Sequence, residues 1–257
     1  MNFNKIYTNG CSFTCGGGLH WEDVKEVYRV HHNIEIDNHL HFSYPFLLSK
    51  KLGVGLINDA VPGGSSNRLV RTTYKYLFEN KNDLINTLFI LEIPPFWRDE
   101  MYSNELGRLI NLTITSIHSY FDVTDYANGN DKNDLRKIHD NLTNYFYNFI
   151  EEKFEKNKMM INIFGLISYM KLLNLKFILI DSGDFRHFLE TQNLTICKDN
   201  FLWFDSKPLW EWMNMKKILI KNETNNLSKD EHLGIEGNKI VSNVIYEYIK
   251  ENKTSFG

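Results

Sequence analysis

The chain has 257 residues, of which 42% are hydrophobic and 24% are charged, the composition of an ordinary soluble globular protein. Its formal net charge is −3 and its Lys and Arg residues are scattered, which excludes a nucleic-acid partner on electrostatic grounds. No stretch is apolar for long enough to span a bilayer, and the first ten residues lack the pattern of a signal peptide. With three cysteines and no zinc-ligand spacing, we expect a cytoplasmic location.

Strand-like and helix-like runs alternate along the chain, which is typical of an α/β protein with a parallel sheet. We expect strands at 5–9, 55–58, 87–93, 176–181 and 201–204. The run at 87–93 is almost continuously apolar, as in a central parallel strand. We expect helices at 44–52, from Ser66 or Asn67 through Leu77, over about 135–149 and at about 237–250, because apolar residues there recur every three or four positions.

No internal repeat, proline-rich linker or break in composition divides the sequence. Residues 1–257 are therefore predicted to form a single domain, with an irregular or helical insertion at about 97–140 that covers the carboxyl edge of the sheet. Open α/β sheets bind ligands at that edge.

A serine lies on a sharp turn at this edge. The first strand ends in Gly10-Cys11-Ser12 and is followed by glycines, which exposes the Ser12 hydroxyl to a ligand. A serine attacks only when a base removes its proton, and a carboxylate commonly orients that base. Asp230 and His232 precede the last helix, and alternate residues of an extended segment share a face. The pattern predicts a Ser-His-Asp triad, although an isolated Asp-x-His is more often a plain solvated loop.

The turn after the second strand, residues 63–67, contains the glycines and amides that an oxyanion needs. The backbone N–H of Gly64 and the side-chain amide of Asn67 are the candidate donors. A simple strand-to-helix turn explains the same residues equally well.

In this order the three segments resemble the SGNH or GDSL hydrolase superfamily. Gly10–Thr14 (GCSFT) is similar to its first block, Asn58–Leu69 to its second and Asp230–Gly237 to its last. The resemblance implies a flavodoxin-like three-layer α/β/α sandwich with a central parallel sheet of about five strands. It also implies ester hydrolysis without metal or cofactor, with Ser12 as nucleophile, His232 as base and Gly64 as oxyanion glycine.

The sequence departs from the family pattern at several places, among them the last block, where the usual Asp-x-x-His is shortened to Asp-x-His. Cys11 replaces the aspartate of the GDSL signature, and the segment after the third strand reads LEIPPFWRDE where the family has Gly-x-Asn-Asp. The family's oxyanion asparagine is therefore absent from its usual position. Trp97 and Arg98 in this segment are candidates for binding substrate, although lid or core packing explains them equally well.

Three other groups of residues have a structural explanation. Cys11 is a rival nucleophile, but free cysteines are usually buried. Asp181 is expected to cap the loop after its strand. Four histidines, His31, His32, His39 and His41, lack an acidic or cysteine partner at ligand spacing, so we predict no metal site.

The sequence thus predicts a serine hydrolase that cleaves an acyl ester, preferentially an acetyl ester, of a carbohydrate or small molecule through an acyl-enzyme. Two alternatives remain open: an acyltransferase that moves an acetyl group onto a glycan, and a catalytically silent glycan-binding or assembly protein on the same fold.

Overall fold

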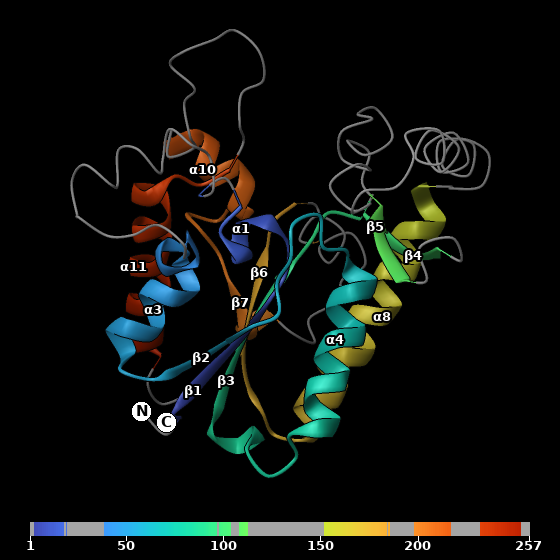
Figure 1. Cartoon of the computed structure of the whole chain (residues 1–257), viewed down its shortest axis with the longest axis horizontal. Helices are drawn as coiled ribbons and strands as arrows, with labels where there is room; N and C mark the ends of the chain where they lie inside the picture. Colours follow the sequence, from blue (N-terminus) through green and yellow to red (C-terminus); the bar gives the residue numbers. More distant parts are fainter. Residues whose placement is uncertain are drawn as a thin grey trace, which may run out of the picture.

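The computed structural model describes residues 3–17, 19, 39–96, 98–103, 108–112, 152–183, 185, 198–216 and 232–252. These residues form three layers, in which a five-stranded sheet separates two groups of helices (Figure 1). Every strand of this sheet is parallel to its neighbours, so the predicted fold class is confirmed.

The sheet has the strand order β2-β1-β3-β6-β7. Its strands are β1 (Lys5–Asn9), β2 (Gly55–Asn58), β3 (Thr87–Ile93), β6 (Lys176–Asp181) and β7 (Phe201–Leu202). The first four have the predicted bounds. The fifth is shorter than predicted because the chain turns after Leu202, and Phe204 instead forms an isolated antiparallel bridge with Lys207. All seven residues of β3 are buried, as its apolar run predicted.

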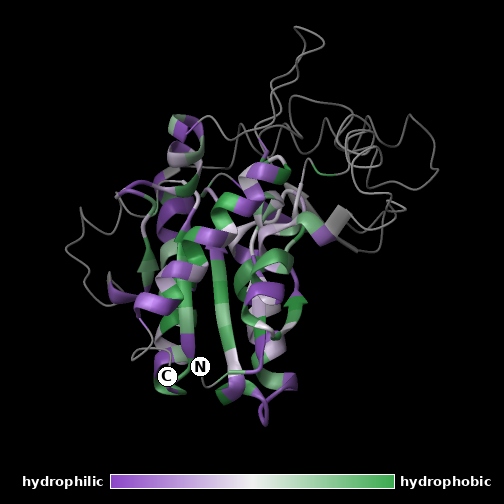
Figure 2. Cartoon of the chain, turned by 90° about the vertical axis from the view of Figure 1, so that its left-hand side faces the viewer, coloured by the Kyte–Doolittle hydropathy of each residue, from purple (hydrophilic) through white to green (hydrophobic). Residues whose placement is uncertain are grey.

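The two faces of the sheet bury alternate residues of each strand, as the period of two requires. On one face, Ile6, Leu88 and Ile178 pack against α3 (Tyr44–Leu52), α10 (Leu209–Lys216) and α11 (Ile235–Glu251). On the other face, Tyr7, Phe89 and Phe177 pack against α4 (Ser66–Glu79) and α8 (Glu152–Leu172). Figure 2 shows the result, with hydrophobic strands enclosed by helices that carry hydrophilic residues.

The residues at the helix ends explain where the helices begin and end. α3 ends as predicted at Gly53, whose φ of 68° is the left-handed conformation that glycine adopts without strain. α4 is capped by Ser65, whose Oγ accepts the N–H of Arg68 at 3.1 Å. The cap predicted at Ser66 or Asn67 is therefore wrong by one or two positions. An N-cap oxygen accepts the N–H of a residue two or three positions later, and for the N–H of Arg68 the N-cap residue is Ser65. α10 was not predicted.

The described part of the predicted insertion is not helical. It is an antiparallel hairpin of β4 (Asp99–Ser103) and β5 (Arg108–Leu112), which corrects the expectation of irregular or helical structure there. An ion pair between Arg71 and Glu100, with contacts of 2.8 and 2.9 Å, joins this hairpin to α4. The helix predicted over 135–149 lies outside the described residues.

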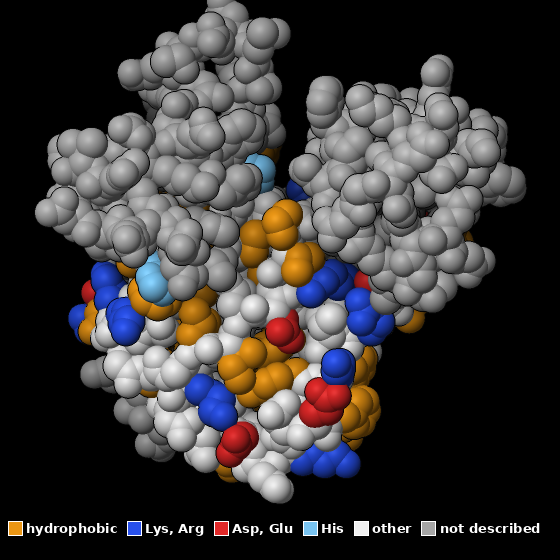
Figure 3. All heavy atoms as spheres, in the orientation of Figure 1, with side chains coloured by type: hydrophobic (Ala, Val, Ile, Leu, Met, Phe, Trp, Pro, Cys, Tyr) orange, Lys and Arg blue, Asp and Glu red, His pale blue; other side chains and the backbone are white. Residues whose placement is uncertain are grey.

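The described surface carries mixed charge. On the face shown in Figure 3, Lys and Arg side chains alternate with Asp and Glu side chains and do not form a stripe of one sign within the described part. In the described ranges, no helix combines the length and apolar character that crossing a membrane requires.

Candidate active site

The predicted nucleophile lies on a turn at the carboxyl edge of the sheet. A short helix, α1 (Ser12–Cys15), follows β1 directly and ends at Gly16, whose φ is 84°. Ser12 is 5% exposed. As the first residue of the helix, it has a backbone N–H with no acceptor inside α1. Ser12 therefore has both a hydroxyl that is shielded from solvent and a backbone N–H that is available as a donor.

A buried carboxylate from the neighbouring strand holds this turn. Glu92 of β3 is fully buried, and its Oε2 accepts the backbone N–H groups of Cys11 and Thr14, both at 3.1 Å, together with the Thr14 hydroxyl. Its Oε1 accepts the Cys11 thiol at 2.9 Å. A Cβ on Gly10 would lie 2.6 Å from Oε2, so only glycine lets the carboxylate approach this closely. Glu92 therefore fixes the turn from which Ser12 projects.

The predicted base lies beside the predicted nucleophile. Both lie close to Gly17, because a Cβ built on it would lie 2.8 Å from Ser12 Cβ and 3.0 Å from His232 Cδ2. The ring of His232 also lies against Phe13, with 5.7 Å between ring centroids. The structure thus brings together two residues from opposite ends of the sequence. Asp230 and Trp97 lie outside the described residues.

A series of buried hydrogen bonds connects the loops of these two residues. The Thr14 hydroxyl, bound to Glu92, also bonds the Tyr44 hydroxyl at 2.7 Å, and the backbone N–H of Tyr44 donates to Asn238 Oδ1 at 2.8 Å. Asn238 Nδ2 donates to the carbonyls of Leu233 and Gly234 at 3.1 and 3.0 Å, directly after His232. The side chains of Glu92, Thr14, Tyr44 and Asn238 are fully buried. The positions of Ser12 and His232 are therefore coupled through β3, α3 and α11.

The glycine turn after β2 contacts the nucleophile turn, as an oxyanion role requires. A Cβ on Gly64 would lie 2.5 Å from the Gly10 carbonyl oxygen and 3.4 Å from Cys11 Cα. The Gly64 N–H, however, donates to the Val61 carbonyl at 3.1 Å. The N–H that was predicted to bind the oxyanion thus forms a hydrogen bond within its own turn in this structure.

The amide of Asn67 is also held by neighbours. Its Nδ2 donates to Asp99 of β4, and its Oδ1 accepts from Asn162 of α8 at 2.7 Å. An amide nitrogen has two N–H groups, and the bond to Asp99 uses one of them. These contacts tie the start of α4 to the hairpin and to α8, a structural role that the sequence did not predict.

The rival nucleophile is chemically inert. Burial, followed by the nearby negative charge of Glu92, raises the pKa of the Cys11 thiol to about 12. Burial and the charge of Cys11 raise the pKa of Cys15 to about 12 as well. Only a thiolate is a good nucleophile. Neither residue therefore competes with Ser12 at neutral pH.

We expect iodoacetamide at pH 8 to leave Cys11 and Cys15 unmodified in the folded protein and to alkylate both in urea. Their folded pKa values lie above the ordinary value of 9.0. As pH rises from 9 toward 12, the unfolded chain loses these protons while the folded chain keeps them, so stability falls with rising pH. Mass spectrometry of the alkylated peptides, together with urea unfolding at pH 8 and pH 10, measures both effects. Rapid modification of native Cys11 would contradict the assignment.

Other side chains of types that could carry chemistry have structural roles. Asp181 Oδ1 accepts the N–H groups of Gly183 and Phe185 at 2.9 and 3.3 Å, which confirms its predicted role in the loop after β6. Trp212 packs in the core against Phe204, with 4.9 Å between ring centroids. His41 stacks on Phe46 at the surface. Among the described residues, no group of three or more His, Cys, Asp or Glu side chains could hold a metal ion.

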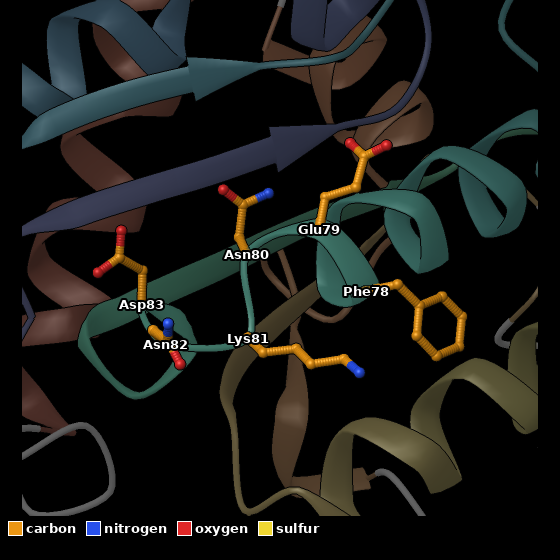
Figure 4. A pocket seen from close by; sticks show the side chains of 6 residues that line it. All are labelled: Phe78, Glu79, Asn80, Lys81, Asn82 and Asp83. Atoms are coloured by element: carbon orange, nitrogen blue, oxygen red, sulfur yellow. The ribbon is translucent and has the colours of Figure 1, made fainter.

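A surface hollow lies at the opposite edge of the sheet. It is lined by residues 78–83, in the turn between α4 and the start of β3. Figure 4 shows that the side chains of Phe78, Glu79 and Lys81 diverge and do not converge on one point. The carboxyl edge, where Ser12 and His232 lie, is the better candidate for chemistry.

We expect Gly17→Ala to slow any reaction at Ser12 by about 10- to 100-fold, because displacements of about 1 Å in a reacting pair have effects of this size, and to lower the free energy of unfolding by about 1–3 kcal/mol through overpacking. The added methyl group would overlap Ser12 and press on His232, and no left-handed φ prevents alanine at this position. Activity and thermal unfolding of the same samples measure the two effects. Gly165→Ala is a matched control, because the nearest atom to a new Cβ there is Tyr74 Oη at 3.8 Å. Equal activity in both variants would contradict the close contact of Gly17 with both side chains.

The chain has structural neighbours but no match at the level of sequence. No protein-family model and no curated protein matches it. It is similar to the psychrotrophic esterase EstA from Pseudoalteromonas sp., with 13% identity, a TM-score of 0.48 and coverage of 96% of this chain and 97% of that chain. It is also similar to a G-D-S-L family protein from Desulfitobacterium hafniense DCB-2, with 11% identity, a TM-score of 0.46 and coverage of 95% and 98%.

A third neighbour is a carbohydrate esterase whose active site displays divergent catalytic and non-catalytic binding functions. Identity is 11%, the TM-score is 0.45, and the match covers 99% of this chain and 67% of that chain. At identities and TM-scores this low, activity has to be inferred from the residues of this chain.

Proposed function

We propose that the protein is a serine ester hydrolase with Ser12 as nucleophile, His232 as general base and Asp230 as the residue that orients His232. The observation that carries the proposal is that Ser12 and His232 both lie against Gly17 at the carboxyl edge of the sheet. The buried hydrogen bonds from Glu92 to Asn238 support it, because they fix both loops relative to one another. A reacting pair needs such preorganisation.

In the proposed reaction, His232 accepts the Ser12 proton while Ser12 Oγ attacks the ester carbonyl carbon. The tetrahedral intermediate then collapses, and His232 gives its proton to the departing alcohol. Water attacks the acyl group on Ser12 with His232 again as base, which releases the acid and restores the serine. The Ser12 N–H is one donor for the oxyanion, and Gly64 or Asn67 supplies the second after a small rearrangement of the contacts described above.

The proposed substrate is an acyl ester, preferentially an acetyl ester, of a carbohydrate or another small molecule. Trp97 would stack on a sugar ring, and Arg98 lies one residue away in the same segment. No metal or cofactor takes part in these steps.

A fluorophosphonate probe tests the proposal directly, because it reacts readily only with an activated serine. We expect stoichiometric labelling of the full chain, located at Ser12 by peptide mass mapping, and blocked by prior denaturation. Absence of labelling would favour the catalytically silent alternative, which the engaged N–H of Gly64 supports. Product analysis with and without a sugar acceptor separates hydrolysis from acyl transfer.

A further inference from the structure

Arg98 is a charged side chain whose hydrogen-bonding capacity is not satisfied within the described part of the chain. Its Nε and Nη1 atoms are buried and have no hydrogen-bond partner there, while its backbone N–H donates to the Pro95 carbonyl at 3.2 Å. A buried donor without an acceptor is destabilising, and more so on a charged group. Such a group indicates that something else completes its surroundings.

The acidic side chains near Arg98 in the sequence are already bound to other donors. Glu92 accepts from Cys11 and Thr14, as described above. Asp99 accepts from Asn67 and from Lys158 Nζ, the latter at 2.7 Å. Glu100 forms its two-pronged ion pair with Arg71. Three carboxylates thus lie within six residues of Arg98 along the chain, and its Nε and Nη1 atoms pair with none of them.

The segment that carries Arg98 borders the candidate active site. It leaves the carboxyl end of β3 just after Glu92, and Ser66 Oγ at the start of α4 donates to the Pro94 carbonyl at 3.3 Å. α4 in turn follows the glycine turn that touches Gly10 and Cys11. The positive charge of Arg98 also lowers the pKa of Cys11, against the larger opposing effects of burial and Glu92, so the charge acts on the neighbour of Ser12.

We propose that Arg98 binds a carboxylate of the substrate, so that the ester hydrolysed at Ser12 is an anionic one. A planar guanidinium matches a carboxylate in shape and charge, and the ion pair is strong where water is excluded. The inference rests on the proposed esterase function and adds a substrate class to it. In this proposal Arg98 binds a permanent charge on the substrate, and the transient oxyanion is bound by the donors at Ser12 and at Gly64 or Asn67.

Matched pairs of neutral and anionic esters test the proposal with the full chain. One pair, 4-acetoxybenzoate and its methyl ester, places the charge on the alcohol side, and another, monomethyl and dimethyl adipate, places it on the acyl side. We expect wild-type kcat/KM to be about 10- to 100-fold higher for the anionic member of at least one pair, the effect of one hydrogen-bonded charge. In Arg98→Gln this preference should disappear, because KM for the anionic ester rises about 10- to 100-fold while the change for the neutral ester is much smaller.

Two variants serve as controls. Arg71→Gln removes a cation that is already paired with Glu100, and it should leave the preference unchanged. Arg98→Lys keeps the charge and should retain part of the preference, which separates binding from folding if Arg98→Gln is unstable. No wild-type preference in either pair, or equal losses on neutral and anionic esters in Arg98→Gln, would overturn the proposal. Failure of the proposed function itself would look different, since no ester would then be cleaved and Ser12 would not be labelled.

Discussion

Replacing Ser12 by alanine is expected to lower kcat for ester hydrolysis by about 10³- to 10⁶-fold, the range found when the serine of a serine–histidine pair is removed. Without Oγ no acyl-enzyme forms, and the backbone donors alone leave only residual catalysis. Stability should change little, because the described contact of this hydroxyl is a weak approach of 3.9 Å to Cys11 Sγ. Initial rates with a short-chain nitrophenyl ester, together with thermal unfolding, measure both quantities.

Ser49→Ala is the matched control for this experiment. Ser49 has the same exposure as Ser12, 5%, but lies on α3, where its Oγ donates to the Phe46 carbonyl. Its replacement should leave the rate unchanged. His232→Ala should cause a loss comparable to that of Ser12→Ala, because the pair acts as a unit, whereas His41→Ala at the surface should have no effect. A Ser12→Ala enzyme that kept a tenth of its activity would exclude Ser12 as the nucleophile.

The sheet could be predicted from the sequence because local patterns determine it. The near-continuous apolar run of β3 and the short runs of β1, β2 and β6 gave correct bounds for four strands. α10 was missed because its buried residues, Leu209, Trp212 and Met213, occupy only two turns in a segment rich in tryptophan. The hairpin of β4 and β5 was missed because its pairing depends on contacts between segments that have no strong turn signal.

The candidate site was predictable only in part. The order of the three segments along the chain pointed to Ser12 and His232, and the structure places them together. The roles of Glu92 and Asn238 were not predicted, because they depend on how β1 pairs with β3 and how α11 packs beside α3. The one available signal was an acidic residue inside the apolar run of 87–93, which is costly to bury without partners. The engaged donors of Gly64 and Asn67 likewise follow from tertiary contacts that no local pattern reveals.

Removal of the Glu92 side chain should affect both stability and activity. We expect Glu92→Ala to lower the free energy of unfolding by about 3–5 kcal/mol, since it leaves several buried donors unsatisfied and opens a cavity in the central strand. The N–H groups of Cys11 and Thr14 would lose their acceptor, and the turn that carries Ser12 would lose its anchor. Labelling of Ser12 by the fluorophosphonate probe should therefore slow by about 10-fold or more even in the folded fraction. Urea unfolding and labelling rates at a temperature where the variant is folded measure the two effects.

Three further replacements separate the ways in which Glu92 contributes to stability and to labelling: through its volume, its hydrogen bonds and its place in the fold. Glu92→Gln keeps the volume, and its amide oxygen can accept the same two backbone N–H groups, so a smaller loss of about 1–2 kcal/mol is expected. Thr14→Val removes the hydroxyl that joins Glu92 to Tyr44 and should slow labelling while the anchoring of Cys11 persists. Asp83→Ala, which breaks a surface ion pair with Lys5, should cost less than about 1 kcal/mol and leave labelling unchanged. If Glu92→Ala were as stable and as reactive as Asp83→Ala, Glu92 would not be the residue that holds the nucleophile turn in place.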